Sequence, residues 1–83
     1  MKNIQFMKDE ILKILKETRP EFQFEENVNF IESGYLDSFD VITIVSDLEI
    51  KFDVKINGSL ILPENFSSVN LIYNLILSSK NAS

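Results

Sequence analysis

Apolar residues recur three or four positions apart in three stretches of the chain. The stretches are residues 3–18, Ser38 or Phe39 to Phe52, and Ser67 or Ser68 to about Leu77. This spacing places the apolar side chains of each stretch on one face of a helix. In the second and third stretches, the opening serine is expected to be the N-cap. The pattern therefore predicts three amphipathic α-helices.

Proline and glycine punctuate the chain between these stretches. Proline disfavours helical geometry in the residue before it, so Arg19-Pro20 is expected to end the first helix. Pro63 suits a first helical position and predicts one short helical turn over residues 63–66. Asn57-Gly58 is typical of a two-stranded hairpin, but an isolated hairpin would be marginal in a helical chain. We therefore expect a loop there.

These elements predict a small all-α fold, a four-helix bundle with three longer helices and one short helix. We expect residues 1–83 to form a single domain, with residues 78–83 as a frayed polar tail. The core is expected to be built from apolar residues of the helices and of the loop before Pro63. These are Ile11, Leu15, Val45, Leu48, Phe52, Ile56, Val69, Ile72 and Ile76.

Residues 20–37, between the first two helices, show no sustained periodicity. They contain too many apolar residues for a solvated linker, namely Phe22, Phe24, Val28, Phe30, Ile31, Tyr35 and Leu36. We expect a long loop that these side chains pin over the core. A loop of this length is uncommon in so small a domain and often serves function.

The helix expected after Ser38 has apolar residues on two opposite faces. Its outer stripe consists of Phe39, Ile42 and Ile50 with Thr43 and Ser46 among them, bordered by Asp40, Asp47 and Glu49. One interpretation is that the loop of residues 20–37 folds over the outer stripe and buries it. The other is that the stripe is a docking face, whose apolar residues bind a partner and whose acidic rim orients it.

The composition narrows the classes of function. An apolar fraction of 45% is too high for a disordered chain, and no apolar run is long enough to span a bilayer. The net charge is −5, and residues 20–50 hold eight acids and no base, so nucleic acid would be repelled. The N-terminus lacks a signal-peptide pattern, and the absence of cysteine suits a reducing compartment. We expect a cytoplasmic monomer.

Ser38 lies in the segment GYLDSFD, where nothing nearby in the sequence is expected to activate it. The chain has no histidine, and no lysine occurs from residue 17 to residue 50, which argues against a catalytic triad or Ser-Lys dyad. Without histidine or cysteine, no metal site is expected either. Two compatible roles remain: a helix N-cap, or a site that another enzyme modifies. A phosphate on this hydroxyl would be favoured by the helix dipole.

The segment FIESGYLDSFDVITIVSDLEIKFDVKI resembles the signature region of the acyl carrier proteins and the related peptidyl and D-alanyl carrier proteins. Leu36-Asp37-Ser38-Phe39 stands where that family has an Asp-Ser-Leu type motif. PENFSSVNLIYNLI is similar to the short third helix and the start of the fourth helix of the family. The resemblance covers essentially the whole chain and is closest over residues 28–76.

This resemblance implies a carrier and not an enzyme. A separate phosphopantetheinyl transferase, recognising Asp37, would attach 4′-phosphopantetheine from coenzyme A to Ser38. The thiol of that arm would hold an acyl or aminoacyl group as a thioester. Partners would include a loading ligase or transferase and downstream acyl-using enzymes. They would dock on the helix after the serine, at Phe39, Ile42, Ser46, Asp47, Glu49 and Ile50.

Four positions depart from the pattern of fatty-acid carriers. Phe39 replaces the usual leucine or methionine, Thr43 and Ile50 stand where acids are usual, and Lys51 adds a base. These departures favour a specialised carrier, in lipid or secondary metabolite biosynthesis or in polysaccharide modification, over the housekeeping fatty-acid carrier. The rival hypothesis is an acidic helical interaction module in which Ser38 serves only as an N-cap.

Overall fold

The computed structural model describes residues 4–81 as an all-helical fold. Its elements are α1 (Ile4–Thr18), α2 (Ser38–Phe52), the 3₁₀ turns η1 (Gly58–Leu60) and η2 (Pro63–Phe66), and α3 (Val69–Asn81). No strand occurs in this part of the chain, so the prediction that Asn57-Gly58 does not form a hairpin is confirmed, although Gly58 begins the 3₁₀ turn η1. The expected short helix is a single 3₁₀ turn, and η1 was not predicted. The architecture is therefore three α-helices with two 3₁₀ turns.

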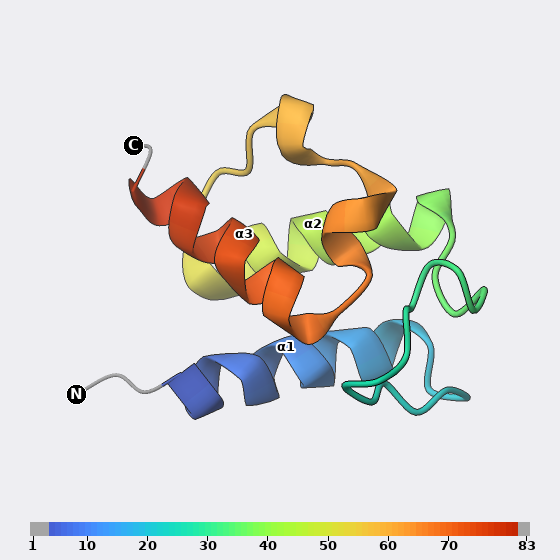
Figure 1. Cartoon of the computed structure of the whole chain (residues 1–83). Helices are drawn as coiled ribbons and strands as arrows, with labels where there is room; N and C mark the ends of the chain where they lie inside the picture. The colour runs from blue at the N-terminus through green and yellow to red at the C-terminus, as the bar shows by residue number, and fades with distance from the viewer. Residues whose placement is uncertain (1–3, 82–83) are drawn as a thin grey trace.

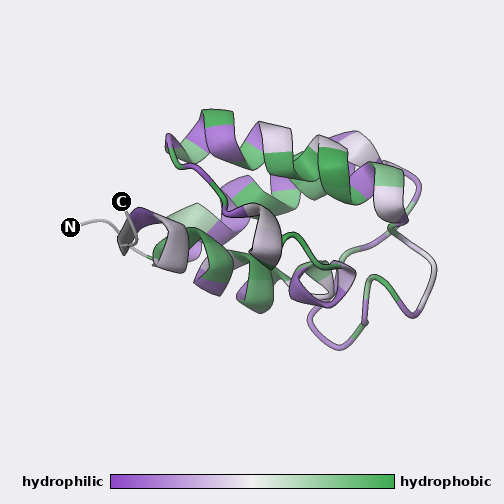
Figure 2. Cartoon of the chain, turned by 90° about the horizontal axis from the view of Figure 1, so that it is seen from above, coloured by the Kyte–Doolittle hydropathy of each residue, from purple (hydrophilic) through white to green (hydrophobic). Residues whose placement is uncertain are grey.

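The helices pack around α1, which contacts both α2 and α3. The turn η2 packs against α3 and α2. The first turn of α1 and the last turn of α3 lie at one end of the molecule (Figure 1). The loop of residues 19–37 lies at the opposite end, together with the start of α2 (Figure 1). Hydrophobic residues recur along all three helices, as their amphipathic patterns require (Figure 2).

The helix ends follow from local hydrogen bonds. The Arg19 N–H still donates to the Leu15 carbonyl at 2.9 Å, and α1 stops just before Pro20, as predicted. At the end of α2, Asp53 adopts a left-handed φ of 54° and donates its N–H to the Glu49 carbonyl. Such a residue turns the chain away from the helix axis and satisfies a terminal carbonyl.

The last helix begins where the sequence predicts but ends later. Ser68 Oγ accepts the Leu71 N–H at 3.1 Å, which confirms Ser68 as the capping residue. The predicted end near Leu77 is too early, because α3 continues to Asn81. Ser79 is buried in this last part and donates its hydroxyl to the Leu75 carbonyl at 2.9 Å. Helix α3 thus includes most of the segment that was predicted to be a frayed polar tail. Residues 82–83 of that segment lie outside the described range.

The core contains most of the predicted residues and several from the loop. Seven of the nine expected core residues are buried, while Phe52 and Val69 are partly buried at its edge. Further buried residues come from the helices, from η2 and from the loop before α2. These are Met7, Ile14, Val41, Ile44, Leu75, Phe66, Phe24, Phe30 and Leu36.

The loop of residues 19–37 is held by aromatic packing and by backbone hydrogen bonds. Phe30 is fully buried, and its N–H donates to the Ser67 carbonyl at 2.9 Å. Phe24 packs edge-on against Phe30, with 4.9 Å between the ring centroids, and Phe22 stacks on Tyr35 at 4.3 Å. The prediction that apolar side chains pin this loop over the core is confirmed. The loop supplies part of the core and thereby places the chain for the start of α2.

Candidate functional site

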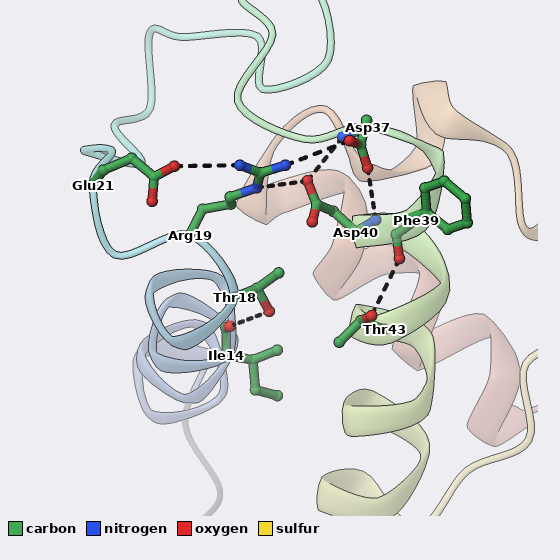
Figure 3. A network of polar contacts seen from close by, with 8 residues as sticks. All are labelled: Ile14, Thr18, Arg19, Glu21, Asp37, Phe39, Asp40 and Thr43. Atoms are coloured by element: carbon green, nitrogen blue, oxygen red, sulfur yellow. Dashed lines mark hydrogen bonds and ion pairs between the residues drawn. The ribbon is translucent and has the colours of Figure 1, made fainter.

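A reciprocal pair of hydrogen bonds between two aspartates opens α2. The Asp40 N–H donates to Asp37 Oδ1 at 2.9 Å, and the Asp37 N–H donates to Asp40 Oδ2 at 3.0 Å (Figure 3). Asp37 is therefore the N-cap, and the prediction that Ser38 caps this helix is wrong. The Asp37 side chain accepts a hydrogen bond from a first-turn amide. Because its carboxylate is charged, it also interacts favourably with the helix dipole.

The Ser38 hydroxyl is left free by this capping arrangement. Ser38 is the first residue of α2 and is exposed, and within residues 4–81 its hydroxyl takes part in no hydrogen bond. This differs from Ser68, whose hydroxyl is occupied by capping α3. A phosphate ester on Ser38 would lie at the start of a helix, where terminal N–H groups and the dipole favour negative charge.

Arg19 connects the end of α1 to the start of α2. Its Nε donates to Asp40 Oδ2 at 2.9 Å, and its two terminal nitrogens reach Glu21 Oε2 at 3.3 Å and Asp37 Oδ2 at 3.4 Å (Figure 3). The contact with Asp40 is the shortest, and its carboxylate is mostly buried. One guanidinium therefore faces three carboxylates around the capping box.

The pKa values of two of these groups are displaced in the direction that the contacts require. The pKa of Asp37 lies below its ordinary value, chiefly because the Asp40 N–H donates to its carboxylate and further because Arg19 is close. The pKa of Arg19 is raised, chiefly by its hydrogen bond to Asp40 and then by that to Glu21. Asp37 is thus held in its charged form beside Ser38.

The outer stripe of α2 is open to solvent. Phe39, Ile42 and Ile50 are 83%, 60% and 82% exposed, and Thr43 and Ser46 between them are exposed as well. The Phe39 ring points away from the Arg19 network (Figure 3). The interpretation in which the loop of residues 20–37 covers this stripe is therefore wrong. The aromatic residues of the loop turn into the core instead.

The acidic border of the outer stripe is narrower than the sequence suggests. Asp40 is buried and engaged in the capping box, so its expected place on the border is wrong. Glu49 is half-buried and accepts the Ile56 N–H at 2.9 Å, which ties α2 to the loop that follows it. Asp47 is also half-buried. The acidic border therefore consists of Asp47 and Glu49, which are both half-buried, and Glu49 also supports the fold.

Arg19 belongs to this site, although the sequence did not predict it. Residues 20–50 form an acidic region without a base, and Arg19, which precedes them, folds back onto two of their aspartates. A usable signal was present, because Arg19 is the single arginine of the chain and Asp37 and Asp40 have the spacing of a capping box. Pairing them needs the tertiary contact, since 21 positions separate Arg19 from Asp40.

Two further properties concern the described part of the chain as a whole. Within residues 4–81, no three histidine, cysteine, aspartate or glutamate side chains form a group that could hold a metal ion. No helix in this range is long and apolar enough to cross a membrane.

The fold and the site define a class: an all-helical domain that presents an exposed serine at the start of a capped helix. The family model of the phosphopantetheine attachment site matches residues 5–76, and the chain belongs to this family. Its cofactor is covalently attached 4′-phosphopantetheine. Comparisons with curated proteins and with solved structures gave no significant match. Membership of the carrier family, predicted from the sequence, is confirmed.

Proposed function

We propose that Ser38 carries the phosphopantetheine arm and that the protein holds an acyl or aminoacyl group as a thioester on the thiol of that arm. The observation that carries this proposal is the exposed Ser38 hydroxyl, left unused because Asp37 caps the helix. The exposed serine at mid-helix, Ser46, lies two turns further along α2, away from the terminal N–H groups that would stabilise a phosphate ester.

The modification needs a separate enzyme, because the chain has no histidine, and no lysine from residue 17 to residue 50, to activate the Ser38 hydroxyl. Ser38 Oγ attacks the phosphorus that bears the pantetheine part of coenzyme A. A P–Oγ bond forms, the pyrophosphate P–O bond breaks, and adenosine 3′,5′-bisphosphate leaves. A base of the transferase accepts the hydroxyl proton. Asp37 is the residue beside Ser38 that this transferase recognises, since its carboxylate is charged and more than half exposed.

The docking surface for loading and acyl-using enzymes combines residues of the outer stripe with the two acids, Asp47 and Glu49, that border it. Exposed large apolar side chains are costly to keep in water and supply affinity when a partner covers them. The residues of this surface are Phe39, Ile42, Ser46, Asp47, Glu49 and Ile50. Phe39 and Ile50 are the most exposed of its large apolar side chains and give the surface an apolar character that suits a dedicated partner of a specialised pathway.

The test is to incubate the protein with coenzyme A and a broad-specificity phosphopantetheinyl transferase and to measure its intact mass. We expect one phosphopantetheine on the wild type and on Ser46→Ala, and none on Ser38→Ala. Because Ser38 does not cap α2, Ser38→Ala should retain the circular dichroism spectrum of the wild type. Addition to Ser38→Ala, or no addition to the wild type, would show that Ser38 is not the attachment residue.

A further inference from the structure

We propose that Arg19 is a positioning residue of the attachment site, which holds the start of α2 in the orientation that presents Ser38 to the transferase. This inference rests on the proposed role of Ser38. It starts from the only ionic contacts that the structure gives between the end of α1 and the first turn of α2 in residues 4–81.

Arg19 is itself held in place. Its N–H donates to the Leu15 carbonyl at 2.9 Å as α1 ends, and its carbonyl accepts the Phe22 N–H at 3.3 Å. Its side chain is only about one-third exposed (34%) as it crosses to α2. A planar guanidinium donates several hydrogen bonds in fixed directions, so an anchored arginine can act as a rigid brace.

The brace reaches Ser38 through Asp40. Asp40 Oδ2 accepts both Arg19 Nε at 2.9 Å and the Asp37 N–H at 3.0 Å. The same oxygen thus joins Arg19 to the backbone of the residue immediately before Ser38. Arg19 also offsets the charge of two carboxylates that the capping box brings together. Without that positive charge, Asp37 and Asp40 would repel each other, and the first turn of α2 would lose its fixed geometry.

The site is suited to such a brace because a transferred group must approach the serine oxygen along a defined direction. Small displacements of a reacting group reduce the rate strongly. The direct contact between Arg19 and Asp37 is longer, at 3.4 Å, and more than half of the Asp37 side chain is exposed. Asp37 therefore remains accessible to a partner while Arg19 and Asp40 fix its backbone.

The test compares transfer kinetics of Arg19→Gln, Arg19→Lys and the matched control Lys16→Gln, which removes an exposed positive charge one turn earlier in α1. We expect kcat/KM for the carrier to fall about tenfold in Arg19→Gln and to stay unchanged in Lys16→Gln. Arg19→Lys should lie between them, because an ammonium keeps the charge but not the planar fork. All proteins are assayed below their unfolding transitions.

A second comparison separates positioning from a general effect on folding. If Arg19 acts through Asp40, Arg19→Gln should cause little further loss of kcat/KM in an Asp40→Asn background. Amide hydrogen exchange at Asp37 and Asp40, whose N–H groups donate within the capping box, should be faster in Arg19→Gln than in Lys16→Gln. Should Arg19→Gln fail to fold, the same comparisons with Arg19→Lys decide the question.

Two results would overturn the inference. One is a folded Arg19→Gln protein that is modified with the wild-type kcat/KM; the other is an equal loss with and without Asp40→Asn. In both cases the wild type is still modified at Ser38, so the proposed function stands. If the wild type accepts no phosphopantetheine at all, the proposed function fails, and the inference about Arg19 fails with it.

Discussion

At the scale of single residues, the start of α2 divides two tasks between neighbours. Asp37 caps the helix with its carboxylate, and Ser38 presents a hydroxyl that no other group of the described chain engages. If Ser38 were the cap, its hydroxyl would be occupied, and attaching a group to it would remove the cap. Capping by the preceding residue keeps helix stability independent of the chemical state of the serine.

This division predicts different effects of two alanine substitutions on stability. Asp37→Ala should lower Tm by several degrees, because it removes the cap and half of the reciprocal hydrogen bonds. Ser38→Ala should change Tm little. Thermal unfolding followed by circular dichroism measures both. Asp37→Asn, which preserves an acceptor oxygen at the cap, is the control and should lose less than Asp37→Ala; equal losses in Ser38→Ala and Asp37→Ala would contradict the assignment of the cap.

At the scale of the element, α2 faces the core on one side and solvent on the other. Ile44 and Leu48 are fully buried, whereas Phe39 and Ile50 are more than four-fifths exposed. Opposite faces of one helix cannot both point into the same core, and the loop of residues 19–37 does not cover the second face, because its aromatic residues pack against the core. The outer stripe therefore stays available to a partner.

The two faces of α2 should respond in opposite ways to substitution. Ile50→Glu should leave the free energy of unfolding close to that of the wild type, because Ile50 is already 82% exposed, while weakening loading by the cognate partner enzyme. Leu48→Ala, the control for the core face, should cost about 2–5 kcal/mol of stability. Urea unfolding and a loading assay on the modified protein provide the two measurements. A large loss of stability in Ile50→Glu would place that residue in the core instead.

At the scale of the whole molecule, ion pairs join the helices at both ends of the interface between α1 and α2. Arg19 forms the pairs near Ser38. At the other end, Glu10 pairs with Lys51 of α2 at 2.8 Å, and it also pairs with Lys13 of its own helix at 3.6 Å. Glu10 is buried, and its hydrogen bond from Lys51 is the main reason that its pKa lies below the ordinary value of 4.5.

The lowered pKa of Glu10 predicts how stability depends on pH. A carboxyl whose pKa is lower in the folded state stabilises the fold fully above its ordinary pKa, and this contribution disappears as pH falls through the folded value. Glu10→Gln should therefore be less stable than the wild type at neutral pH, and the difference should shrink once pH falls below 4.5. Urea unfolding at a series of pH values measures this, with Glu17→Gln, an exposed carboxylate of the same helix, as control. A difference that does not change with pH would argue against the ion pair.

The parts of the fold and of the candidate site that could be predicted from the sequence are those that depend on neighbouring residues in the chain. Helical periodicity located all three α-helices, Pro20 and Pro63 located a helix end and a 3₁₀ turn, and the motif around Ser38 indicated the carrier family. These features depend on residues close together in the chain, so a sequence can report them directly. The prediction of Ser38 as the cap failed, because the residue before it, Asp37, is also a good cap and the sequence does not show which of the two the helix uses.

Only the tertiary structure decided what each side chain meets across the chain. Periodicity shows that Phe39 and Ile50 share a face, but it does not show whether another segment covers them; the packing of Phe24 and Phe30 into the core leaves that face open. Likewise, the sequence by itself determined an acidic region beginning after Arg19, whereas folding brings Arg19 back onto Asp40. The reason is physical: burial and ion pairs depend on distances in space between residues that are far apart in sequence, and these distances exist only once the helices have packed.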